Sequence, residues 1–199
     1  MRAVLGLTLI LVLARPAPLA AQWLVGVEGT LESVGGVSRS IQPGGASFGI
    51  HHPAWIGLRI ESPRARVQWR AGVAYAAPSL ALDAPEVTVI EHAGVTTVTA
   101  LRAGVIVRLA QLQPGVALRV EAGPVLEWWR FESSATRLRG GGEIGLSLTV
   151  GLGGRFSGAL GGFVGVTPVS PLEPADLPEG IEPRSAWRRA LRGSVGLAL

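Results

Sequence analysis

The sequence predicts an all-β fold, an eight-stranded antiparallel up-and-down transmembrane β-barrel. Apolar and polar side chains alternate along most of the chain, short and long connections alternate between these segments, and aromatic residues stand near the segment ends. A strand places successive side chains on opposite faces. Because almost every predicted strand has one continuous apolar face, the pattern favours a barrel closed in a membrane, where no strand edge is left unpaired.

The composition limits the class of protein. The chain has 199 residues, enough for one domain, and 48% of them are hydrophobic. The absence of cysteine excludes disulfides, thiol nucleophiles and cysteine-based metal sites. The net charge is +4, but the arginines are spread at strand spacing and interleaved with glutamates. Nucleic-acid binding needs a continuous basic patch, so we expect no nucleic-acid partner.

The N-terminal segment reads as a secretory signal peptide. Arg2 gives a positive start, a short apolar run follows, and Leu19-Ala20-Ala21 offers a small-residue cleavage site before Gln22. The apolar run is too short to cross a bilayer as a helix, which needs about 20 residues. We therefore expect export with removal of residues 1–21, and a barrel domain formed by residues 22–199.

Three strands are predicted first, at residues 23–34, 46–61 and 67–76. Pro53 interrupts the second of them, and because proline cannot donate a hydrogen bond to a neighbouring strand, we expect a bulge there. A long connection follows the third strand, and residues 87–90 are expected to pair briefly within it.

Residues 97–129 give the clearest signal, two strands joined by a tight turn at residues 111–114. In the first strand apolar residues such as Leu101 are odd-numbered and Arg102 is even-numbered. In the second strand the parity reverses, so each strand has one apolar and one charged face. Ile106 shares the face of Arg102, and we expect this interior position to tolerate serine.

Three strands remain, at residues 137–151, 156–167 and 186–199. Residues 168–185 contain five prolines and four acidic residues, which predicts a loop. Three of the connections between strands are short turns, and the other four are longer. Short turns at one end and long loops at the other are typical of an up-and-down outer-membrane barrel.

Six aromatic residues share the parity of the apolar face and lie near strand ends. Bilayers favour amphipathic aromatic side chains at both interfaces, so we expect two girdles. Trp23, Trp69 and Phe156 are assigned to the end with short turns, and Tyr75, Trp128 and Trp187 to the end with long loops.

Charged residues on the other face are expected to point into the barrel. Unpaired charges in a narrow interior are costly, so these arginines and glutamates should form one network that fills it. The predicted network consists of Glu28, Glu32, Arg59, Glu61, Arg70, Arg102, Arg108, Arg119, Glu121, Glu127, Arg139, Glu143, Arg188 and Arg192. Arg189 breaks the parity rule and is expected to reach water at the rim.

The signal peptide, the eight alternating strands and the short-turn and long-loop asymmetry resemble the small eight-stranded outer-membrane barrels of the OmpA/OmpX type. The resemblance covers nearly all of residues 22–199 and rests on the pattern, without a specific motif. It implies a monomeric, non-enzymatic, porin-like protein in the outer membrane of a Gram-negative-type bacterium. A structural, surface-interaction or narrow-channel role would follow. Such barrels usually end on an aromatic residue, whereas this chain ends on Leu199.

The loops suggest partners besides outer-membrane lipid. An acidic surface suits lipopolysaccharide bridged by divalent cations, or a basic surface partner, although ordinary solvated loops explain it equally well. The acidic loop residues are Asp83, Glu86, Glu91, Glu132, Glu173, Asp176, Glu179 and Glu182.

Two other functions stay open at this point. A lipid-modifying enzyme would need a serine, a histidine and an acid together, and no motif joins Ser47, His51, Glu91 and His92. A secreted soluble β-barrel that binds an apolar ligand would enclose the apolar face instead. We expect no cofactor or metal site, because adjacent residues such as His51 and His52 on a strand point to opposite faces.

Overall fold

The structure is a computed structural model that describes residues 22–41, 45–63, 65–84, 86–91, 96–132 and 136–199. The expected signal peptide and His92 lie outside these residues. Within them, no helix is long and apolar enough to cross a membrane.

Eight strands close into an antiparallel barrel, as the sequence predicts. Around the wall they follow the order β1, β13, β11, β10, β9, β8, β5 and β4, and pairing of β1 with β13 and with β4 completes the ring. Their bounds are β1 Leu24–Gly35, β4 Ala54–Glu61, β5 Val67–Ala76, β8 Thr96–Gln113, β9 Val116–Phe131, β10 Arg137–Gly153, β11 Phe156–Thr167 and β13 Ala186–Ala198.

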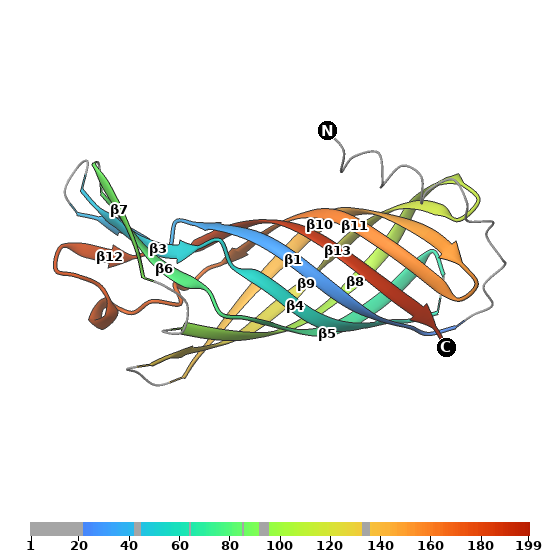
Figure 1. Cartoon of the computed structure of the whole chain (residues 1–199), viewed down its shortest axis with the longest axis horizontal. Helices are drawn as coiled ribbons and strands as arrows, with labels where there is room; N and C mark the ends of the chain where they lie inside the picture. The colour runs from blue at the N-terminus through green and yellow to red at the C-terminus, as the bar shows by residue number, and fades with distance from the viewer. Residues whose placement is uncertain (1–21, 42–44, 64, 85, 92–95, 133–135) are drawn as a thin grey trace.

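The two ends of the barrel differ. Tight turns join β4 to β5, β8 to β9 and β10 to β11 at one end, which we call the turn end (Figure 1). At the opposite end, the loop end, three longer connections carry short elements that we call the lobe, whereas the connection between β9 and β10 spans only residues 132–136. The lobe comprises β2 Ser38–Ser40, β3 Ser47–His51, β6 Ser79–Ala84, β7 Val87–Glu91, the 3-10 helix η1 Pro174–Asp176 and β12 Ile181–Pro183. β3, β6 and β7 form one small sheet, and β2 pairs with β12.

The second predicted strand is divided in the structure. β3 belongs to the lobe and β4 to the barrel, with His52 and Pro53 between them. His52 has a φ of 31°, in the left-handed region that non-glycine residues seldom occupy. The prediction of one strand with a bulge is wrong, because the chain changes direction at His52 and Pro53 and leaves one sheet for the other.

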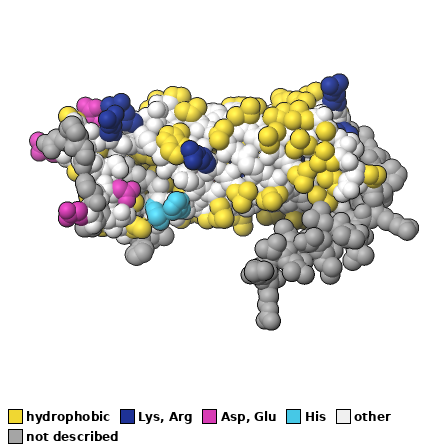
Figure 2. All heavy atoms as spheres, turned by 90° about the horizontal axis from the view of Figure 1, so that it is seen from above, with side chains coloured by type: hydrophobic (Ala, Val, Ile, Leu, Met, Phe, Trp, Pro, Cys, Tyr) yellow, Lys and Arg dark blue, Asp and Glu magenta, His cyan; other side chains and the backbone are white. Residues whose placement is uncertain are grey.

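Alternation along the strands gives the barrel an apolar outside and a charged inside. In β8, Leu101 and Val105 are 46% and 48% exposed, whereas Arg102 is 4% exposed. Figure 2 shows hydrophobic side chains spread along the barrel wall, with acidic and basic side chains both present near the loop end. The exposed apolar residues of the wall include Val27, Leu31, Ile56, Leu58, Val73, Ile144, Leu146, Leu160, Val164, Leu191 and Val195.

Candidate functional site

Every barrel strand except β11 sends charged side chains into the interior. These side chains are at most 12% exposed, and each forms at least one ion pair within 4.0 Å. The set contains as many arginines as glutamates, so its formal charges cancel. It consists of Arg59, Arg70, Arg102, Arg119, Arg188, Arg192, Glu28, Glu32, Glu61, Glu121, Glu127 and Glu143.

Glu143 on β10 is the centre of the larger of two clusters. Arg192 donates two hydrogen bonds to its carboxylate, Nη1 to Oε1 at 3.0 Å and Nη2 to Oε2 at 2.8 Å. Arg70 donates to the same Oε1 atom, and Arg102 Nε lies 4.0 Å from Oε2. Arg102 Nη1 also donates to Glu28 Oε1 at 3.1 Å. Such multiply bonded carboxylates satisfy charges that would otherwise be costly to bury.

The same cluster extends toward the turn end. Arg70 Nη1 donates to Glu121 Oε2 at 2.6 Å, and Ser147 Oγ donates to the other oxygen of Glu121. Arg119 Nη2 lies 3.7 Å from Glu121, and its Nη1 donates to Glu61 Oε2 at 3.1 Å. Arg59 Nη2 completes the series 3.1 Å from Glu61 Oε1. The whole cluster thus ties seven strands together through side chains as well as backbone, namely β1, β4, β5, β8, β9, β10 and β13.

The smaller cluster lies toward the loop end. Both terminal nitrogens of Arg188 donate to the carboxylate of Glu127, one of them at 2.6 Å, and its Nε lies 3.6 Å from Glu32. Trp129 Nε1 donates to Glu127 Oε2 at 2.9 Å, and Thr167 Oγ1 accepts from Arg188 Nη2 at 2.6 Å. The bidentate arginine–carboxylate pair fixes both side chains in one geometry.

Aromatic rings separate the interior guanidinium groups, a feature that the sequence analysis missed. The guanidinium carbons of Arg192 and Arg70 lie 4.0 and 5.5 Å from the ring centroid of Phe163. Arg102 lies 5.0 Å from the centroid of the Trp55 ring. These contacts place each cation over an aromatic face, where the ring quadrupole attracts it. The signal was present in the sequence, because Phe163 has the parity of the interior face of β11.

Two residues of the predicted network lie outside these clusters. Arg108, near the turn end, donates from Nη2 to the backbone oxygen of Ala65 at 3.0 Å. Arg139, near the loop end, donates from Nε to the Ser170 oxygen at 2.7 Å and from Nη2 to Glu173 at 3.1 Å. Including both in an interior network was wrong, because each lies beyond the enclosed part of the barrel and bonds to a connection.

An apolar cluster fills the interior at the loop end. Leu172, from the connection between β11 and β13, is 2% exposed there and packs with the inward-facing Trp55 and Trp129. The cluster comprises Val37, Ile50, Trp55, Ala74, Ala76, Leu80, Val98, Ala100, Val125, Trp129, Phe131, Leu172 and Ala186. Residues of the lobe and its connections therefore cover the mouth of the barrel.

Polar contacts hold this cover in place. Arg137 Nη2 donates to Asp176 Oδ1 at 2.9 Å, and its Nη1 donates to the other oxygen of Asp176 and to the Pro171 backbone oxygen. Ser170 Oγ donates to the Val37 oxygen at 3.0 Å. The hydrogen bond from Arg137 lowers the pKa of Asp176 below its ordinary value of 3.8. Asp176 is therefore ionised, and paired, at neutral pH.

The barrel is similar to solved structures of outer-membrane proteins. No protein-family model matches the sequence, and no curated protein matches it. The crystal structure of Neisserial surface protein A superposes with a TM-score of 0.57 at 8% identity, covering 89% of this chain and 97% of that one. The fold is that of the small eight-stranded outer-membrane barrels. Ail of Yersinia pestis, crystallised with the heparin analogue sucrose octasulfate, gives a TM-score of 0.50 at 10% identity, covering 91% of this chain and 100% of that one.

The six aromatic residues expected at the rims of such a barrel face outward. Trp23 and Trp69 lie at the turn end with ring centroids 4.9 Å apart, and Phe156 is at the same end. Toward the loop end, Tyr75 and Trp128 lie in one row, because both pair with Thr99 of β8. Trp187 is close to the start of β13, in register with Gly35.

The histidines differ from the expectation. The rings of His51 and His52 lie 4.4 Å apart, because His52 is no longer in an extended conformation, so the prediction of opposite faces is wrong. In the described part of the chain neither ring bonds to a serine or a carboxylate. No group of three or more His, Asp or Glu side chains is placed there to hold a metal ion.

Proposed function

We propose that this protein is an integral outer-membrane barrel with a closed interior, which anchors the lobe at the cell surface for contact with a basic partner. The main support for this proposal is that side chains fill the interior of the barrel. Paired charges fill the middle of the interior, and an apolar cluster fills its mouth. The barrel then serves as a scaffold, and the parts that remain accessible are its outer wall and the lobe.

The exposed apolar wall supports the membrane location. Leu31, Ile56 and Leu191 are each more than half exposed, and similar residues surround the barrel. Exposed apolar surface of this extent is unfavourable in water and normal against lipid. Outward-facing aromatic residues near both ends suit the two interfaces of a bilayer.

The filled interior argues against conduction. An eight-stranded barrel is only wide enough for its own side chains. Beside Glu32, Glu143 and Arg188 there is a cavity of about 20 Å³, room for about one water molecule. A conducting path would require the ion pairs and the apolar cover to separate together, which is costly for buried charges.

The lobe supports a surface-interaction role. On the strand β7, at the edge of the lobe sheet, Val89 and Ile90 are 55% and 37% exposed. Glu86, Glu132 and Glu179 are exposed in the loop-end connections, and in the part of the chain that the structure describes no arginine forms an ion pair with these carboxylates. The Ail crystal contains a polyanion, whereas this surface has acidic groups to offer. We therefore assign a basic partner to the lobe.

Electrical recording tests the sealed interior. The purified protein, refolded into planar lipid bilayers, is expected to show no stepwise current in 1 M KCl. A variant in which residues 168–185 are replaced by a short Gly-Ser linker removes Leu172 and is the matched comparison for the cover. Steady ohmic current through the wild-type protein would contradict a closed barrel.

A further inference from the structure

Arg189 on β13 is a cation on the outer wall. It lies between the outward-facing Trp187 and Leu191, and it is exposed. Its guanidinium carbon is 4.9 Å from the centroid of the Trp187 ring. In the described residues no carboxylate forms an ion pair with it. A cation at the edge of the hydrocarbon layer is unfavourable unless it reaches the headgroups or an anion.

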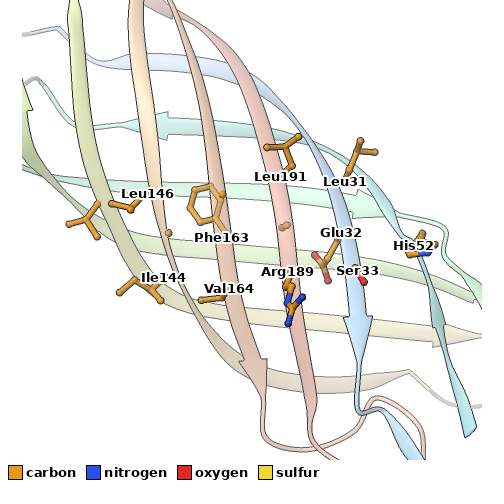
Figure 3. Close-up of a pocket in the computed structure, with 14 residues that line it drawn as sticks. Leu31, Glu32, Ser33, His52, Ile144, Leu146, Phe163, Val164, Arg189 and Leu191 are labelled. Atoms are coloured by element: carbon orange, nitrogen blue, oxygen red, sulfur yellow. The ribbon is translucent and has the colours of Figure 1, made fainter. Parts of the chain in front are cut away.

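A groove of about 1030 Å³ in the outer wall crosses β1, β13, β11 and β10, with Arg189 on its side nearest the loop end (Figure 3). Leu31 and Leu146 are among the apolar side chains along it. Gly162 forms part of its floor, because it lies in register between Leu191 and Leu146 and has no side chain. The groove is therefore long, apolar and open to whatever surrounds the barrel.

Polar groups gather at the Arg189 end of the groove. Ser33 is the register partner of Arg189 on β1, and His52 lines the same end. Figure 3 shows Arg189 on β13, Ser33 on the neighbouring β1 and His52 in the short link before β4, beyond the apolar residues Leu191 and Leu146. A guanidinium donates paired hydrogen bonds to a phosphate, and a hydroxyl and an imidazole add further donors.

We propose that this groove binds a phosphorylated acyl lipid, with the phosphate at Arg189 and an acyl chain along the groove. The proposal rests on the membrane location proposed above and identifies one lipid contact of the barrel. Arg189 lies two residues from Trp187, on the strand segment near the loop end. The lipid therefore belongs to the leaflet on the lobe side, the outer leaflet.

A second groove in the outer wall differs from the groove at Arg189 in the orientation of its arginines. It has a volume of about 540 Å³ and is lined mostly by apolar residues of β1, β4, β5, β8 and β9. The arginines that border it, Arg59 and Arg102, point inward and pair with Glu61 and Glu28. Only the first of these two grooves has an outward cation for a headgroup.

The test uses two variants with matched controls. Arg189→Gln removes the cation, and Arg155→Gln removes an exposed arginine from the turn end. Gly162→Leu fills the groove, and Gly140→Leu adds the same side chain at an exposed glycine outside it; a Cβ at either position has no atom within 4 Å. Each protein is folded in detergent micelles, and folding is checked by heat-modifiable migration. Native mass spectrometry then counts retained lipid A, a phosphorylated acyl disaccharide, or its dephosphorylated form.

The wild-type protein and both controls should retain one lipid A molecule and release the dephosphorylated form. Arg189→Gln and Gly162→Leu should each weaken retention of lipid A by about 10- to 100-fold. Equal retention of the two lipid forms, or full retention by Arg189→Gln, would overturn the phosphate site. A protein that folds in micelles but retains no lipid A refutes this inference alone. A protein that folds and stays soluble without detergent refutes the proposed membrane location.

Discussion

Arg102 illustrates how a single interior residue holds the barrel together. Its guanidinium bonds to Glu28, lies 4.0 Å from Glu143 and covers the Trp55 ring. The parity of β8 predicts that Arg102 faces inward. It does not predict which carboxylate it meets, because Glu28 is 74 residues away in the sequence and the distance depends on barrel closure.

Replacing Arg102 should show how much its ion pair with Glu28 contributes to the stability of the barrel. Arg102→Leu leaves Glu28 buried without its hydrogen-bonded partner and is expected to lower the free energy of unfolding by about 3–5 kcal/mol. The double variant Arg102→Leu/Glu28→Leu removes both charges and should recover much of that loss. Urea unfolding in micelles, followed by tryptophan fluorescence, measures both. If the double variant is less stable than the single one, the ion pair is not the source of the effect.

Asp176 makes the cover over the mouth sensitive to acid. Because Arg137 lowers its pKa in the folded protein, the stability that it contributes is present above pH 3.8 and is lost as the pH falls through the lowered value. Methyl NMR of Leu172 should report release of the cover only at acidic pH. Asp176→Asn should weaken the cover at neutral pH, where the wild-type carboxylate is ionised and paired with Arg137, and should remove this acid transition. A wild-type transition between pH 5 and 7 would exclude Asp176 as its cause.

At the scale of the element, β8 shows what the period of two can and cannot predict. The alternation correctly separates Val105 from Ile106, since one is 48% exposed and the other is fully buried. It does not report how tightly an interior position is packed. Ile106 has no exposed surface at all. We therefore no longer expect this position to tolerate serine.

Both faces of β8 should therefore resist substitution, for different reasons. Val105→Arg places a charge against lipid near the middle of the wall and should cost about 2–4 kcal/mol. Ile106→Ser leaves a cavity and a buried hydroxyl in the interior, and should cost about 2–5 kcal/mol. Urea unfolding in lipid vesicles measures both. Val105→Thr, which adds no charge, is the control, and a loss as large as that of Val105→Arg would count against lipid contact.

At the scale of the molecule, the sequence was sufficient to predict the barrel but not the lobe. Barrel strands repeat one pattern and pair with near neighbours, so local alternation and turn lengths are enough to predict them. The lobe joins segments from different connections: β2 pairs with β12, and Ser170 reaches Val37 across 133 residues. The cover of the mouth depends on those contacts, and no local pattern in residues 168–185 predicts it.

Spin labels on the barrel wall test directly whether its apolar face lies against lipid. Because the chain has no cysteine, single cysteines at Val105, Ile144 and Leu160 can carry nitroxide spin labels without further changes. Labels at Val89 in the lobe and at Arg155 in a turn serve as water-exposed references. In lipid vesicles, electron paramagnetic resonance should show the three wall labels to be accessible to oxygen and protected from a water-soluble nickel chelate. Labels that are immobile and protected from both reagents would mean that the apolar face is enclosed, as in a soluble barrel, and would contradict contact between this face and lipid.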